Sequence, residues 1–91
     1  MIRRHVVVSG EVQGVFFRDT CRRTAAEHGV SGWVRNRADG SVEAVFEGEP
    51  DAVGRVVDWT RQGPPAARVE KAEVVEEDPE GLTGFAVLPS G

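Results

Sequence analysis

The chain has 91 residues, of which 40% are hydrophobic and 29% charged, and its net charge at neutral pH is −4. This length predicts one domain over residues 1–91, and no apolar run approaches the roughly 20 residues that a membrane-spanning helix needs. The single cysteine excludes an internal disulfide and a cysteine-rich zinc site, and it favours a cytoplasmic protein.

Residues 2–9 alternate as a β-strand does, which points Val6 and Val8 toward the core and His5 toward the opposite, more polar face. We therefore interpret His5 as a partly exposed strand residue and not as a catalytic base. The N-terminal residues lead directly into this strand and do not form the apolar region of a secretion signal.

A loop over residues 10–17 follows the strand and contains Gly10 and Gly14, with Arg18 four residues after the second glycine. Glycine adopts positive φ at little cost, so the backbone N–H groups of such a turn can converge on an anion. A helix that begins near Arg18 adds unpaired N–H groups, and the Arg18 guanidinium can bind two phosphate oxygens at once. The spacing alone leaves two interpretations open: a phosphate-binding loop, or an ordinary strand-to-helix turn with Arg18 in solvent. Apolar side chains should fix the loop to the core: Val12, Val15 and one of Phe16 and Phe17.

The spacing of apolar residues predicts a helix over residues 18–28, with Cys21, Ala25 and His28 on one face and Gly29 after its end. We interpret Cys21 as a small buried hydrophobic residue, because no histidine or asparagine at a recognisable distance would activate it as a nucleophile.

Residues 31–38 and 41–48 predict a β-hairpin with Asp39-Gly40 at its turn. Asn36 lies near the end of the first of these strands, where asparagine is disfavoured. It is either a turn former or a residue kept for its hydrogen bonds, and the pattern favours neither. The second strand shows two different faces, which indicates that only one of them is buried: Val42, Ala44 and Phe46 against Glu43, Val45 and Glu47.

A second helix should begin at Glu49-Pro50-Asp51 and end at Gly63-Pro64-Pro65. Its inner stripe is Val53, Val56, Val57 and Thr60. Gly54 inside this helix costs about 1 kcal/mol relative to alanine and has no evident reason. Residues 68–77 predict a fourth strand in which Val69 is out of phase with Ala72 and Val74, which suggests a bulge, and residues 85–88 a short last strand.

This order of elements is that of a ferredoxin-like α+β fold, a split β-α-β sandwich in which two helices cover one face of an antiparallel sheet, here with a short extra C-terminal strand. The third strand then lies between the first and the second, which run parallel and end at the same edge about 10 Å apart. The topology therefore brings the loop and Asn36 to one site, without a histidine, a cysteine or a pair of carboxylates.

The residues at these two places resemble the acylphosphatase family. Residues 10–18, with the sequence GEVQGVFFR, are similar to its first signature. Residues 32–36, with the sequence GWVRN and followed by Gly40, Val42 and Gly48, are similar to its second, and the resemblance extends to Gly63-Pro64 and Phe85. It implies hydrolysis of an acyl phosphate to a carboxylate and phosphate, with Arg18 binding the phosphate and Asn36 positioning the attacking water.

The chemistry of an acyl phosphate agrees with so simple a site. Its leaving group is a carboxylate, so phosphoryl transfer requires mainly alignment and positive charge. Backbone N–H groups and the Arg18 guanidinium can supply that charge, and Asn36 can orient water without acting as a base. We expect phosphate or sulfate, as product-like ligands, to bind the same loop: Gln13, Gly14, Val15, Phe16, Phe17 and Arg18. No cluster has the spacing of metal ligands, so we expect neither a metal nor another cofactor.

Three other functions deserve comparison. An RNA-binding module of this fold would display aromatic residues on its central strands, where this chain has valine, histidine and glutamate. A non-catalytic anion sensor would share the loop and Arg18 but would not need Asn36. A domain of a larger maturation or carbamoyl-transfer enzyme is disfavoured, because the chain has its own start and no linker.

The distribution of charge bears on the partners. Residues 1–40 contain seven basic and four acidic residues, whereas residues 41–91 contain four basic and eleven acidic residues. A basic first half favours a small anion, and an acidic second half argues against the nucleic-acid backbone. We expect a monomer that acts on a small molecule and binds neither nucleic acid nor a membrane.

Overall fold

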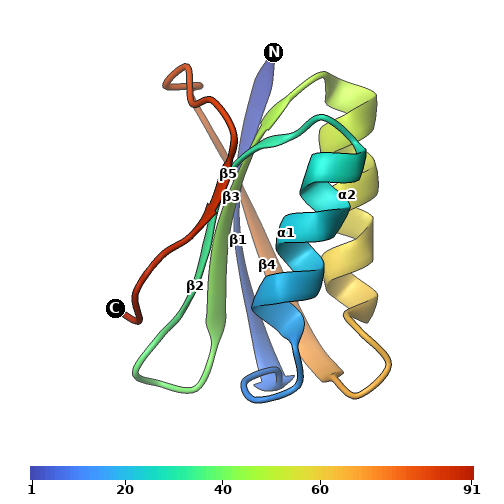
Figure 1. Ribbon diagram of the computed structural model, residues 1–91, viewed down its shortest axis with the longest axis vertical. Helices are drawn as coiled ribbons and strands as arrows, with labels where there is room; N and C mark the ends of the chain where they lie inside the picture. Colours follow the sequence, from blue (N-terminus) through green and yellow to red (C-terminus); the bar gives the residue numbers. More distant parts are fainter.

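The computed structural model describes residues 1–91. Its elements are, in order, β1 (Ile2–Glu11), α1 (Phe17–Glu27), β2 (Ser31–Asn36), β3 (Val42–Gly48), α2 (Pro50–Gln62), β4 (Arg68–Glu77) and β5 (Phe85–Val87). The strand order is β4-β1-β3-β2-β5, and both helices pack on one face of the sheet (Figure 1). The predicted ferredoxin-like arrangement, with β3 between β1 and β2, is therefore confirmed. Neither helix is long and apolar enough to cross a membrane.

The fifth strand makes the sheet mixed. The other four strands pair antiparallel, but β5 runs parallel to β2, with Phe85 opposite Gly32 and Val87 opposite Val34. The sequence predicted residues 85–88 as a short extra strand without naming its partner, and the structure pairs this strand with β2. Because residues 78–84 reverse the chain and carry it from one edge of the sheet to the other, β5 enters antiparallel to β4 and hence parallel to β2.

The boundary between β1 and the following loop also differs from the prediction. β1 continues to Glu11 because β4 pairs with it that far, after a register shift between Ser9 and Gly10. The shift leaves Glu70 without a partner in β1, and it is the bulge that the phase of Val69 predicted. The loop is therefore shorter than expected and begins at Val12.

Two further predicted ends move by one or two residues. α1 ends at Glu27, so His28 is its C-cap and lies exposed, and only Cys21 and Ala25 of the predicted face are buried. The helix ends early because the chain turns at Gly29, which has a φ of +68°. β2 ends at Asn36, and residues 37–41 form the turn to β3.

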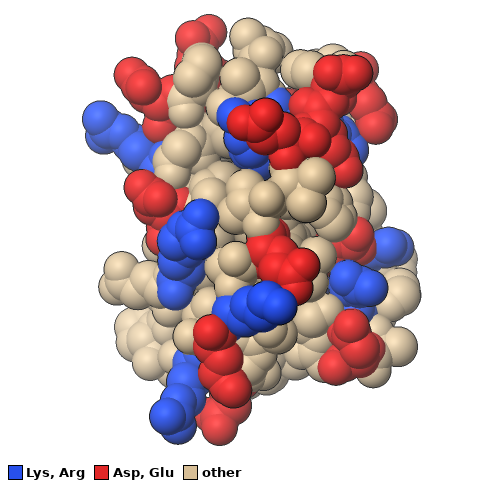
Figure 2. Space-filling view, turned by 180° about the vertical axis from the view of Figure 1, so that it is seen from behind, with Lys and Arg blue, Asp and Glu red and all other residues tan.

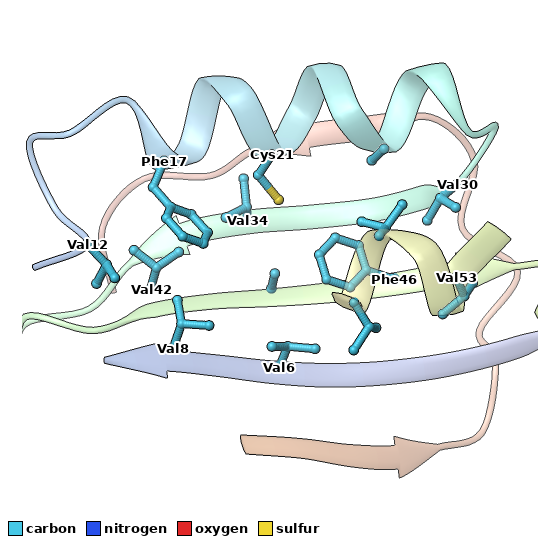
Figure 3. Close-up of a cluster of buried hydrophobic side chains, with 14 residues drawn as sticks. Val6, Val8, Val12, Phe17, Cys21, Val30, Val34, Val42, Phe46 and Val53 are labelled. Atoms are coloured by element: carbon cyan, nitrogen blue, oxygen red, sulfur yellow. The ribbon is translucent and has the colours of Figure 1, made fainter. Parts of the chain in front are cut away.

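The core lies between the sheet and the helices (Figure 3). Val12 and Phe17, at the two ends of the β1–α1 loop, are 1% and 2% exposed, whereas Phe16 is 77% exposed. Phe17 is thus the phenylalanine that anchors the loop. Burial raises the pKa of the Cys21 thiol, in agreement with its interpretation as a core residue. The predicted stripe of α2 is buried as expected: Val53, Val56, Val57 and Thr60.

The face of the sheet opposite the helices is partly covered, which corrects the expectation that β3 buries one face only. Val45 and Glu47 are both buried. The Glu47 carboxylate accepts hydrogen bonds from the backbone N–H groups of residues 80–82 and from the Arg3 guanidinium at 2.7 Å. A buried carboxylate is tolerated when it is paired and fully hydrogen-bonded. Glu47 therefore holds the segment after β4 against this end of the sheet.

Gly54 has no steric reason to be glycine, because a Cβ atom there would meet nothing within 4 Å. We expect Gly54→Ala to raise the free energy of unfolding by about 1 kcal/mol, since alanine favours the helix. Gly32→Ala is the contrasting variant: Gly32 has a φ of +144°, and a Cβ atom would collide with the Val45 carbonyl oxygen. That variant should lose about 3 kcal/mol or more in urea denaturation. A destabilised Gly54→Ala protein would contradict this interpretation.

The Glu47 contacts predict a pH dependence of stability. Burial acts to raise the pKa of Glu47, but hydrogen bonds from Arg3 and from the N–H groups of residues 80–82 outweigh it and hold the pKa below its usual value. The stability that this carboxylate contributes is therefore complete above the pKa of an unfolded glutamate, about 4.3, and is lost as the pH falls through the lower folded-state pKa.

We expect Glu47→Gln to lower the free energy of unfolding by about 2 kcal/mol at neutral pH, and the difference from wild type to shrink toward about pH 3. Urea denaturation over this pH range is the measurement. Glu70→Gln removes an exposed carboxylate that forms no ion pair and serves as the control. A difference between wild type and Glu47→Gln that does not change with pH would show that the charge of Glu47 is unimportant.

Candidate functional site

A pocket of about 440 Å³ lies at the end of the sheet where β1 and β2 finish. Figure 1 shows the β1–α1 loop and the β2–β3 turn at this same end. The structure thus brings together Arg18 and Asn36, as the topology predicted, whereas Gln13 and Val15 are not in the wall. His5 lies on the opposite face of the sheet, where its ring contacts Glu43 at 2.7 Å. The wall consists of Val12, Gly14, Phe16, Phe17, Arg18, Asp19, Asn36 and Val87.

The loop before α1 leaves a series of backbone donors unpaired. Gly14 and Phe16 have φ values of +72° and +65°, which turn the chain sharply before the helix begins. The N–H groups of residues 14–19 have no acceptor within the chain, and the first paired one is that of Thr20, which donates to the Phe16 carbonyl. Because N–H groups at a helix N-terminus attract negative charge, this arrangement favours an anion over an ordinary turn.

Arg18 is half-buried in the pocket wall, and its side chain forms no ion pair or hydrogen bond with the rest of the chain. Its neighbour Asp19 would compete with an anion for it, but Asp19 contacts Arg22 at 2.9 Å and Arg23 at 3.4 Å. The hydrogen bond from Arg22 holds the pKa of Asp19 below its usual range. Asp19 is therefore charged and already paired, which leaves the Arg18 guanidinium available to a ligand.

Asn36 is the last residue of β2 and lies opposite Val42 of β3. Its side-chain Oδ1 is buried without a hydrogen-bond partner, and no other buried side-chain oxygen or nitrogen in the chain lacks one. An unpaired buried acceptor costs about 1–3 kcal/mol unless a ligand or water donates to it. This favours the hydrogen-bonding interpretation of Asn36 over that of a turn former, since its side chain makes no bond to the turn.

Comparison with known proteins assigns the family. The acylphosphatase family profile matches residues 4–87. An acylphosphatase of Gloeobacter violaceus is 62% identical over 89 residues, which are 98% of this chain and 96% of that protein. The chain belongs to the acylphosphatase family.

Solved structures agree with this assignment. The acylphosphatase of Coxiella burnetii superposes with a TM-score of 0.92 at 41% identity, over 96% of this chain and 92% of that one. The acylphosphatase of Bacillus subtilis superposes with a TM-score of 0.93 at 35% identity, over 97% of this chain and 99% of that one. The resemblance in residues 10–18 and 32–48 therefore reflects a similarity that extends over nearly the whole chain.

In this acylphosphatase family member, the Gln13 side chain joins the loop to the β2–β3 turn. Its Nε2 donates to the carbonyl oxygens of Arg37 at 2.8 Å and Ser41 at 2.9 Å. These carbonyls flank the turn that follows Asn36, so the contacts fix Asn36 relative to the loop. We expected Gln13 to take part in the anion site itself. Its position in the motif did not indicate that the side chain turns away from the pocket.

The C-terminal residues hold Asn36 from the other side. The Gly91 N–H donates to the Asn36 carbonyl at 3.0 Å, and the Ala38 N–H donates to the Gly91 carbonyl at 3.1 Å. Val87 enters the pocket wall from the same segment. No sequence signal pointed to these residues, because their position depends on the parallel pairing of β5 with β2. Asp19 was also missed, although its spacing from Arg22 and Arg23 is that of helical ion pairs.

We expect Gln13→Leu to lower the free energy of unfolding by about 1–2 kcal/mol, because it removes both donors that join the loop to the turn. Gln62→Leu is the matched control, since Gln62 is exposed at the end of α2 and its side chain forms no hydrogen bond. It should change stability by less than about 0.5 kcal/mol. Urea denaturation that gives equal values for the two variants would show that the Gln13 contacts contribute nothing.

Proposed function

We propose that this protein hydrolyses acyl phosphates to a carboxylate and inorganic phosphate in the pocket between the β1–α1 loop and the end of β2. Its family, and its 62% identity to a protein named acylphosphatase, support this activity. One observation supports the location: Gly14 and residues 16–19, whose N–H groups are unpaired, line one pocket together with Asn36, whose Oδ1 is unpaired. The N–H groups can bind a phosphate, and the Asn36 Oδ1 can bind a water next to that phosphate.

The phosphate group binds against the loop N–H groups, with the Arg18 guanidinium on two of its oxygens. In a loose transition state the charge is spread over the three equatorial oxygens, and donors aimed at these oxygens lower the barrier. The planar guanidinium matches two oxygens at once, which fixes the orientation of the phosphoryl group as well as its charge. The pairing of Asp19 with Arg22 and Arg23 keeps its carboxylate from opposing this charge.

Asn36 orients the attacking water. Its Oδ1 accepts a hydrogen bond from the water, which directs a water lone pair toward phosphorus, while an amide cannot itself take up a proton. As the new P–O bond forms, the bond to the bridging oxygen breaks and the carboxylate leaves as an anion. The water proton passes to the phosphate product. Because a carboxylate leaves without prior protonation, the pocket functions with no histidine or cysteine in its wall.

We further propose that the reaction needs no metal ion or cofactor. No group of three or more His, Cys, Asp or Glu residues lies close enough to hold a metal. The loop N–H groups and Arg18 supply the positive charge that metal ions supply in other phosphoryl-transfer sites. We also propose that the protein acts as a monomer, because the three groups that the mechanism uses, the loop N–H groups, Arg18 and Asn36, all belong to one chain. The single cysteine, free and buried, is compatible with the cytoplasm.

Two other functions are less well supported. On the face shown in Figure 2, basic and acidic side chains are interspersed, which disfavours binding along a nucleic-acid backbone or an anionic membrane. A non-catalytic anion sensor would use the loop and Arg18 but would leave the Asn36 Oδ1 without a role.

Phosphate release from benzoyl phosphate by protein dialysed against a strong chelator tests our proposal. Absence of phosphate release would refute the enzyme, and recovery of activity with a divalent cation would refute the metal-free reaction.

We expect Arg18→Lys to keep the fold but to lower kcat/KM about a hundredfold, because an ammonium group retains the charge and loses the two-point geometry. Steady-state kinetics and circular dichroism together separate activity from folding. Arg55→Lys, at an exposed position of α2 without an ion pair, is the control and should behave as wild type. If Arg18→Lys keeps more than about half of the turnover, the two-point contact is not important.

Asn36→Ala distinguishes the enzyme from the anion sensor. We expect kcat to fall about a hundredfold while inhibition by inorganic phosphate changes little, because the loop binds the phosphate and Asn36 acts on the water. Asn36→Asp should lower kcat and also weaken inhibition by inorganic phosphate, since a carboxylate repels the phosphoryl group. Inhibition constants and kcat for the three proteins are the measurement. Normal turnover in Asn36→Ala would show that Asn36 only ends a strand.

A further inference from the structure

Phe16 combines two features that the fold itself does not require. Its ring is 77% exposed, and its backbone, with a φ of 65° and a ψ of 21°, makes it the one non-glycine residue of the chain with positive φ. A bulky side chain is strained in this conformation, which glycine or asparagine adopts more easily. Strained residues of this kind concentrate at functional sites. Neither α1 nor the core explains an aromatic ring at this position.

A second exposed apolar side chain lies in the same pocket. Val87 of β5 is 42% exposed, and it lines the wall together with Phe16, Arg18 and Asn36. Only four large hydrophobic side chains of the chain are exposed, and two of them meet at this pocket. Because both are partly open to solvent, they lie at its mouth. We call Phe16 and Val87 the apolar rim.

We propose that the apolar rim binds the acyl group of the substrate, so that the protein favours acyl phosphates with large apolar acyl groups over acetyl phosphate. This inference rests on the proposed function. The acyl group is joined to phosphorus through one bridging oxygen. When the phosphate lies against residues 14–18, the acyl chain therefore extends toward the mouth of the pocket. Covering the rim removes apolar surface of both the protein and the substrate from water.

The size of the preference follows from the area that becomes buried. Complete burial of one methylene group favours binding by about fourfold, and an open rim that covers half of each group gives about twofold. An acyl chain that is longer by four methylene groups should therefore gain about fifteenfold in kcat/KM. The gain should appear mainly as a lower KM, because the rim contacts the acyl chain equally in the ground state and in the transition state.

Hydrolysis of acetyl, butyryl and hexanoyl phosphate by the wild-type protein tests the preference for longer acyl chains. Their carboxylate leaving groups are of nearly equal basicity, so differences in kcat/KM report contacts with the acyl chain. We expect kcat/KM to rise about fifteenfold from acetyl to hexanoyl phosphate. Equal values for the three substrates would overturn the inference and leave the proposed function intact. Failure to hydrolyse any of them would overturn both.

Variants of the rim test the residues themselves. Phe16→Asn removes the ring but retains a residue that tolerates positive φ, and Val87→Thr replaces a methyl group by a hydroxyl of similar shape. The ratio of kcat/KM between hexanoyl and acetyl phosphate should fall about threefold in each. Val75→Thr is the matched control, because Val75 is a 53% exposed strand valine outside the pocket. A ratio that stays at the wild-type value in Val87→Thr and in folded Phe16→Asn would overturn the assignment of these residues.

Discussion

The pairing of β3 with both β1 and β2 is the constraint on which the rest of the structure depends. Residues 42–48 bond to residues 2–8 on one side and to residues 31–36 on the other, and both pairings are antiparallel. β1 and β2 must therefore run in the same direction and end at the same edge of the sheet. The loop with its free N–H groups and Asn36, each at the end of one of these strands, become neighbours without any direct contact between β1 and β2.

The chain contains two sets of consecutive N–H groups that suit an anion, and it treats them in opposite ways. For residues 80–82 the chain supplies the anion itself, the buried carboxylate of Glu47. For residues 14–19 it supplies none, although Asp19 is close, because Arg22 and Arg23 bind that carboxylate. The same local chemistry thus serves stability at one end of the sheet and, in our proposal, phosphate binding at the other.

The sequence was sufficient to predict the position of β3 between β1 and β2, both helices and the meeting of Arg18 with Asn36, because apolar periodicity, glycine and proline are local signals that define the ends of elements. The features that the sequence did not predict concern contacts between distant segments. The parallel pairing of β5 and the burial of Glu47 both depend on the course of residues 78–84, which no periodicity describes. The role of Gln13 depends on the position of carbonyls in another turn, and which phenylalanine is buried depends on the unusual backbone of Phe16.

The same topology has a consequence for the order in which the chain folds. β1 lies at the start of the chain, yet its partners are residues 42–48 and 68–77, and Gly91 bonds to the backbone of Asn36. Such long loops must close before their contacts stabilise anything, which slows folding relative to helical proteins of this size. During synthesis on the ribosome, the β1–α1 loop emerges before β2, β3 and β4. The strand before it gains its pairing with β4 only after residues 68–77 have been made.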